Sequence, residues 1–175
     1  LHDGSNKRND KYGGSVENRA RLLLEVVDAC IGIWCAHRVG VHLSPRGGTH
    51  SMSDSNPALI FNYVAEQLGQ RKIAFIFTRE SLGEDSQMAE LKKRFGGPLI
   101  ANEGYDLAGA ERILSQGHAD AVAFGRAFIA NPDLVTRLRK GAALNEPDSS
   151  TFYGDGAKGY TDYPTLAAGQ PEVTT

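Results

Sequence analysis

The sequence has little cysteine and no cluster of metal ligands. Its two cysteines, Cys30 and Cys35, lie five positions apart in one apolar segment, a spacing that fits neither a CxxC redox pair nor a zinc knuckle. The five histidines are scattered along the chain without an HxxxH pair. We therefore expect two reduced, structural thiols and no metal site built by the protein.

The chain also lacks an excess of charge and a long apolar run. Its 175 residues carry 19 Lys and Arg against 21 Asp and Glu, so no basic field points to nucleic acid or an anionic membrane. No run approaches the roughly 18 apolar residues of a membrane span, and the first residues lack the pattern of a secretion signal. We expect a soluble, cytoplasmic protein, long enough for one compact domain, that binds neither nucleic acid nor membrane.

What the chain does have is a regular alternation of helix and strand patterns. Apolar residues at spacings of three and four predict amphipathic helices, with Ser15, Asn56 and Asp106 as the N-caps of three of them. Short apolar runs predict strands that begin near residues 38, 73, 98 and 121. One helix separates each pair of successive strands, which is the pattern of βα units with parallel strands.

The repeating region is expected to end in one more helix. Asn131 is predicted as its N-cap, with Pro132 at the first helical position and Gly141 at its end. A segment rich in aromatic residues and glycine follows, and it could either fold over a site or form a surface loop. The predicted organisation is four βα units over residues 1–145 and a C-terminal aromatic, glycine-rich segment and tail over residues 146–175.

Parallel strands of this apolar character need cover on both faces, which selects an open doubly wound sheet or a closed barrel. A closed (β/α)8 barrel takes about 250 residues, so four units amount to half of one. Such a half barrel has two open edges.

Functional groups in these folds lie at the carboxyl ends of the strands. Period two places His42 on the face opposite Val41, so it is predicted to point into the barrel, and the alternative is a histidine satisfied by polar neighbours. The segment Thr78–Glu80 follows the second strand.

The ends of the third and fourth strands resemble a phosphate cradle. Gly104 and Gly125 could let backbone N–H groups approach an anion, and Arg126 could add a charged hydrogen bond. The alternative is that both glycines only turn the chain and that Arg126 pairs on the surface.

Four strings occur together in the order and at the spacing of a known family. They are NDKYGGSVENRARLLLEVVDA (9–29), RVGVHLSP (38–45), AVAFGRAFIANPDLVTRL (121–138) and TFYGDGAKGYTDYP (151–164). They resemble the carboxyl-terminal half of the Old Yellow Enzyme family, whose members are FMN-dependent, NAD(P)H-oxidising ene-reductases. The resemblance implies an α/β fold that is the C-terminal half, strands five to eight, of a (β/α)8 TIM barrel.

The resemblance also implies roles for single residues. Gly125 and Arg126 match the family's Gly-Arg pair that holds the FMN phosphate. Glu103 and Gly104 match a loop whose backbone contacts the same phosphate. Tyr153 matches an aromatic residue that lines the substrate pocket.

His42 departs from the family pattern, because many members carry an arginine there, beside the flavin N1 and C2 carbonyl. A guanidinium is permanently charged, whereas an imidazole with an ordinary pKa of about 6.5 is only partly protonated at neutral pH. The flavin potential is therefore expected to be lower or more pH-dependent.

The same resemblance places no catalytic residue in this chain, because the family's substrate-binding and proton-donating side chains come earlier in the sequence. The expected function is the C-terminal part of an FMN-dependent NAD(P)H oxidoreductase that reduces small activated alkenes or nitro compounds. It would need a complementary N-terminal half-barrel chain and be inactive alone. One alternative is a non-catalytic half-barrel assembly subunit. Another is a different phosphate-binding barrel, such as an isomerase or an aldolase; the aldolase fits worst, because no lysine ends a strand.

Overall fold

The computed structural model describes residues 1–48, 51–80 and 83–166. The chain divides into two compact units, a first unit Leu1–Ala123 and a second unit that begins at Phe124. The division after residue 145 that the sequence predicts stays a prediction. Among the described residues, no helix is both long enough and apolar enough to span a membrane.

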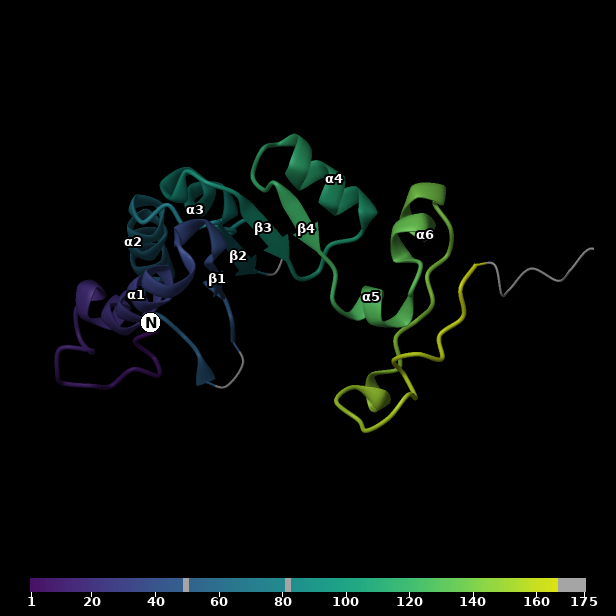
Figure 1. Ribbon diagram of the computed structural model, residues 1–175, viewed down its shortest axis with the longest axis horizontal. Coiled ribbons are helices and arrows are strands. Elements are labelled where there is room, and N and C mark those ends of the chain that lie inside the picture. The colour runs from purple at the N-terminus through teal and green to yellow at the C-terminus, as the bar shows by residue number, and fades with distance from the viewer. Residues whose placement is uncertain (49–50, 81–82, 167–175) are drawn as a thin grey trace, which may run out of the picture. The chain divides into compact units, whose positions relative to one another are not determined.

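The first unit is built on a sheet of four parallel strands (Figure 1). The strands are β1 (Gly40–Leu43), β2 (Phe75–Arg79), β3 (Leu99–Asn102) and β4 (Ala121–Ala123). They lie side by side in chain order, β1-β2-β3-β4, so every neighbouring pair is joined by a βα crossover. The predicted parallel βα repeat is confirmed.

The helices of the first unit begin largely where the sequence predicts. They are α1 (Val16–Trp34), the short 3-10 helix η1 (Ala36–Arg38), α2 (Pro57–Gln70), α3 (Met88–Phe95) and α4 (Leu107–Ser115). The side chains of Ser15, Asn56 and Asp106 each accept a backbone N–H at the third residue of the helix that follows, which confirms all three as N-caps. Gly96, with φ +70°, ends α3 in the left-handed conformation that glycine adopts without strain.

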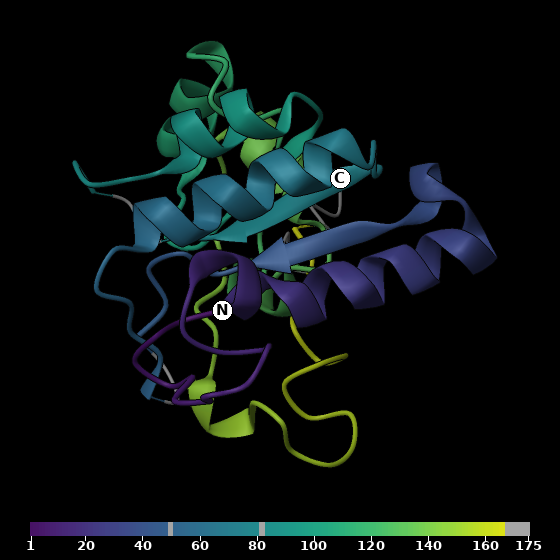
Figure 2. The same cartoon turned by 90° about the vertical axis from the view of Figure 1, so that its left-hand side faces the viewer.

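Only one face of the sheet is covered within the first unit. Side chains that point to this face, such as Leu43, Ile76 and Leu99, are buried with apolar residues of α1 to α4. Figure 2 shows α1 and α2 running along the sheet. Along β1, β2 and β3, the alternate residues are exposed or half-buried. The sheet therefore presents a second, open face, which carries His42 and Phe77.

The second unit contains α5 (Arg126–Ala130), α6 (Leu134–Lys140) and the 3-10 helix η3 (Ser149–Thr151). The prediction that Asn131 caps the last helix is wrong. The Asn131 side chain is buried, where it accepts the Asn145 N–H at 2.7 Å and donates to the Ala127 and Asn145 carbonyls. It links two backbone segments, and α6 begins three residues later. Gly141, with φ +60°, ends α6 as predicted.

Candidate functional site

The register of the strands brings several side chains to the carboxyl end of the open face. His42 pairs with Phe77, and Phe77 pairs with Ile100 on the next strand. One step nearer the carboxyl ends, Arg79 pairs with Asn102. Because paired residues of parallel strands point to the same side, these five side chains share one face.

His42 contacts an aromatic ring on the neighbouring strand. Its ring centroid lies 4.6 Å from that of Phe77, and the two planes meet at 74°. Partial removal from water lowers the pKa of His42, and the positive charge of Arg79 lowers it further. The imidazole is therefore mainly neutral at pH 7, so less of it is charged than an ordinary pKa implies.

Arg79 and Glu103 form a two-pronged ion pair at the ends of β2 and β3. Arg79 Nε donates to Glu103 Oε2 at 3.1 Å, and Nη2 donates to Oε1 at 3.2 Å. Both side chains remain partly exposed, at 40% and 26%. The pair therefore sits where a ligand bound at this edge could contact it.

The loop after β3 has two successive residues in the left-handed region. Glu103 has φ +88° and Gly104 has φ +80°. This conformation is costly for the side-chain-bearing Glu103, by about 1–2 kcal/mol, and free of strain for Gly104. A β-carbon on Gly104 would meet no atom within 4 Å, so the space beside this backbone is open.

Gly125 and Arg126 follow β4 and belong to the second unit. Gly125 is exposed and precedes α5, and a β-carbon there would meet no atom within 4 Å. Arg126 is exposed too, and no ion pair or hydrogen bond engages its guanidinium within the described ranges. Both positions are thus accessible to an anion.

Tyr153 lies in the second unit, in the segment after η3. Its side chain is 98% exposed, and its backbone has φ +60°. The backbone N–H of Tyr153 donates to the Tyr160 hydroxyl at 2.8 Å, which fixes this turn. Its assignment as a pocket-lining residue stays a prediction.

Glu80, which directly follows β2, is a buried carboxylate to which sequence reasoning assigned no role. It accepts hydrogen bonds from Ser86 Oγ and the Gln87 N–H, both at 2.9 Å, and lies 3.8 Å from Arg46. Burial raises the pKa of this carboxyl against the effect of those donors. Glu80 therefore anchors the start of α3.

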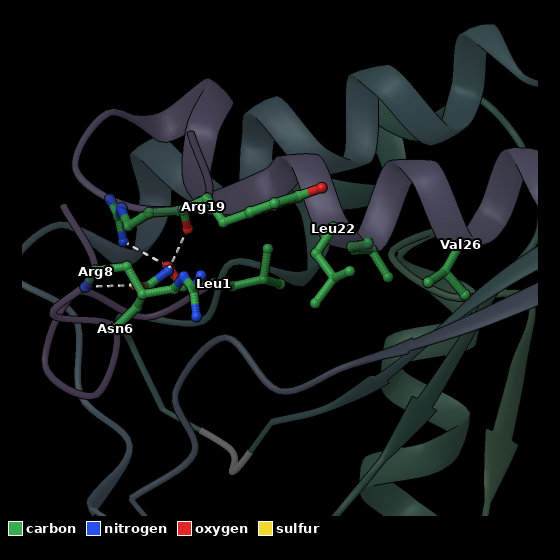
Figure 3. Close-up of a pocket in the computed structure, with 8 residues that line it drawn as sticks. Leu1, Asn6, Arg8, Arg19, Leu22 and Val26 are labelled. Atoms are coloured by element: carbon green, nitrogen blue, oxygen red, sulfur yellow. Dashed lines mark hydrogen bonds between the residues drawn. The ribbon is translucent and has the colours of Figure 1, made fainter. Parts of the chain in front are cut away.

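A cavity of about 610 Å³ opens between the amino-terminal segment and α1 (Figure 3). Its lining is mainly apolar, with Leu1, Leu22 and Val26 among its members, and none of the residues that line it comes from a strand. The guanidinium of Arg19 also borders it but is held by the buried carboxylate of Asp54 and by the Leu1 carbonyl. In the described ranges, no three His, Cys, Asp or Glu side chains gather closely enough to hold a metal ion.

The chain is similar to known flavin-dependent oxidoreductases. Residues 1–145 match the model of the NADH:flavin oxidoreductase / NADH oxidase family. A putative 12-oxophytodienoate reductase 2 of Oryza sativa subsp. japonica is 39% identical over all of this chain, and a probable flavin mononucleotide-dependent alkene reductase of Leishmania infantum is 41% identical over 95% of it.

A solved structure of morphinone reductase in complex with tetrahydroNAD matches 99% of the chain with 45% identity and a TM-score of 0.89. The chain covers 49% and 46% of the two sequence relatives and 48% of that structure. It therefore spans about half the length of the proteins it matches.

Proposed function

The chain belongs to the NADH:flavin oxidoreductase / NADH oxidase family, and we propose that it is the C-terminal part of an FMN-dependent NAD(P)H oxidoreductase that reduces activated alkenes or nitro compounds. The observation that carries the proposal is the match of residues 1–145 to this family, which confirms the resemblance to the Old Yellow Enzyme family. The parallel sheet with polar side chains at its carboxyl ends is in keeping with it.

The residues predicted to hold FMN fit a phosphate group. The exposed guanidinium of Arg126 can donate two charged hydrogen bonds to a phosphate. Open space beside Gly104 and beside Gly125 leaves room for an anion at each backbone. From the resemblance to the family, we propose that Arg126 and the backbone of Gly125, and likewise the backbone of Glu103 and Gly104, would contact the FMN phosphate.

When bound, FMN supplies two-electron hydride chemistry between NAD(P)H and the substrate. The roles of this chain are binding and orientation. By the resemblance to the family, Arg126 and the glycine turns would hold the phosphate of the cofactor, His42 would lie beside the flavin ring, and Tyr153 would line the substrate pocket. Hydride transfer needs donor and acceptor held at close range, so these positioning contacts contribute to rate as well as to affinity.

We propose that a complementary N-terminal half-barrel chain completes the site. Two features of the first unit support this: β1 and β4 are edge strands of the described sheet, and one sheet face is open. Edge strands and half-buried apolar side chains such as Phe77 are stabilised when another polypeptide packs against them. Without that partner we expect little or no catalysis.

The test is co-expression of this chain with an N-terminal half from a member of the family. We expect a yellow complex with FMN absorbance that oxidises NADPH when an activated alkene is supplied. Arg126→Gln should reduce the FMN content of the complex, and Arg112→Gln, on the surface of α4, should not. A complex that forms but stays colourless contradicts the proposal and favours the second candidate, a non-catalytic assembly subunit whose open edges serve only to bind a partner.

A further inference from the structure

Arg79 holds a position that none of the family-derived assignments uses. It is the only lysine or arginine in the four strands, and it is the last residue of β2. Its side chain lies on the open face, two residues beyond Phe77 and therefore at the next position on that face. A fixed positive charge therefore stands at the carboxyl edge of this face.

Glu103 determines where that charge is placed. It binds two of the three guanidinium nitrogens of Arg79, Nε and Nη2. The third nitrogen, Nη1, donates to no group in the part of the chain that the structure describes, and the side chain is 40% exposed. The ion pair orients the guanidinium and leaves one N–H edge available for an acceptor.

The neighbouring polar groups on this face do not provide the same charge. His42 is mainly neutral at pH 7, because desolvation and Arg79 lower its pKa. Asn102, which pairs with Arg79 in the sheet, is uncharged and donates its amide N–H to the Ala123 carbonyl at 2.8 Å. On these strands Arg79 alone offers a permanent cation.

We propose that Arg79, oriented by Glu103, is the cation that this chain presents to the ring system of FMN, from the strand next to His42. The inference rests on the proposed function. Reduction places negative charge on the pyrimidine part of a flavin, and a guanidinium N–H edge is a suitable partner for that charge and for carbonyl oxygens of the ring. Glu103 is then a positioning residue, and Arg79 contacts the cofactor.

The test compares FMN with riboflavin, which has the same ring and no phosphate, in binding to the complex formed with an N-terminal half. Arg79→Gln should weaken the binding of both ligands by a similar factor, about tenfold or more. Arg126→Gln should weaken the binding of FMN more than the binding of riboflavin. Arg71→Gln, which removes an arginine from a partly exposed ion pair with Asp28, is the matched control and should change neither.

Each outcome either supports or overturns the contact between Arg79 and the flavin ring. If Arg79→Gln leaves both affinities unchanged, or weakens FMN alone, Arg79 does not serve the ring and the inference is wrong while the proposed function stands. If the wild-type complex binds neither ligand, the proposed function fails and this inference fails with it. Arg79→Lys keeps the positive charge but lacks the planar guanidinium with its paired N–H donors. We expect its affinity for both ligands to lie between those of the wild type and Arg79→Gln.

A second measurement needs neither flavin nor partner. NMR titration of His42 in the chain alone should give a higher imidazole pKa in Arg79→Gln than in the wild type, because a neighbouring positive charge is removed. The same spectra show whether the variant is folded. An unchanged His42 pKa would mean that the Arg79 charge does not reach this face, and it would overturn the inference.

Discussion

His42 on β1 stands edge-on to Phe77 on β2, with ring centroids 4.6 Å apart. Since desolvation is the larger cause of its lowered pKa, Phe77→Ala should move the His42 pKa back toward 6.5. NMR titration of the imidazole measures this directly. Phe75→Ala, at the other end of β2 on the same face, is the control and should have a smaller effect.

The same shift predicts a pH dependence of stability. The folded pKa of His42 lies below its unfolded value of 6.5, so the unfolded chain binds more protons in the interval between the two. The contribution of His42 is therefore complete above pH 6.5 and is lost as the pH falls toward the folded pKa. Urea unfolding between pH 5 and 8 should show this loss, and a smaller one in His42→Gln.

Replacing the neutral imidazole by a charged group should change the flavin potential. In the complex with an N-terminal half, His42→Arg should raise the reduction potential, because a guanidinium stabilises the negative charge of the reduced ring. His42→Gln should leave the potential nearly unchanged at pH 7, where the imidazole is mainly neutral. A potential that does not respond to His42→Arg between pH 6 and 8 would count against a role for His42 beside the flavin.

Local patterns were enough to predict much of the fold. Ser15, Asn56 and Asp106 cap their helices with their own side chains, and such contacts span only three residues, so sequence reveals them. The same rule predicts an N-cap at Asn131, and that prediction is wrong. Its partner, Asn145, lies 14 positions away, and no local pattern reports a contact of that range.

The candidate site shows the same limit. The alternation of the strand places His42 opposite Leu43, and this could be read from the sequence. The pairing of Arg79 with Glu103 could not be read from the sequence, because it joins two strand ends 24 residues apart. The left-handed backbone of Glu103 could not be predicted either. Glutamate gives no sequence signal for that conformation, unlike the glycine that follows it.

The left-handed backbone at Glu103 predicts that a glycine variant is more stable than an alanine variant at this position. Glu103→Ala and Glu103→Gly both remove the ion pair with Arg79, but alanine keeps the strain of φ +88° and glycine releases it. We expect the glycine variant to be the more stable of the two by about 1 kcal/mol, as measured by chemical denaturation. Equal stabilities would mean that the loop relaxes to another conformation when the carboxylate is lost.

Removing the Glu80 carboxylate should lower the free energy of unfolding and change how that free energy depends on pH. Glu80→Ala leaves the half-buried Gln87 N–H and the exposed Ser86 hydroxyl without their acceptor, and we expect a loss of about 1–2 kcal/mol in the free energy of unfolding. Glu80→Gln keeps an acceptor and should cost less. Burial raises the Glu80 pKa above 4.5, so folding favours the protonated form, and ionisation destabilises the folded chain as pH rises through the folded pKa. Below pH 4.5 the wild type should therefore gain stability relative to Glu80→Gln.

The ion pair of Arg19 and Asp54 fixes the amino-terminal segment against α1. The side chain of Asp54 is fully buried, and it also accepts the N–H groups of Asp3 and Asn56 at 2.9 Å. Burial raises the Asp54 pKa, but these two N–H groups and Arg19 outweigh it, so the pKa lies below 3.8. Arg19→Met leaves this charge without its cation, and we expect a loss of about 3 kcal/mol at pH 7.

A double-mutant cycle separates the effect of the unpaired Asp54 charge from the effect of lost packing around Arg19. Asp54→Asn combined with Arg19→Met removes both charges, so the double variant should be more stable than the sum of the two single losses predicts. The stabilising effect of the pair is present above pH 3.8 and declines as Asp54 is protonated, so the gap between the wild type and Arg19→Met should narrow at low pH. Additive losses, or a gap that does not change with pH, would show that Arg19 acts by packing beside the cavity that it borders and not by its charge.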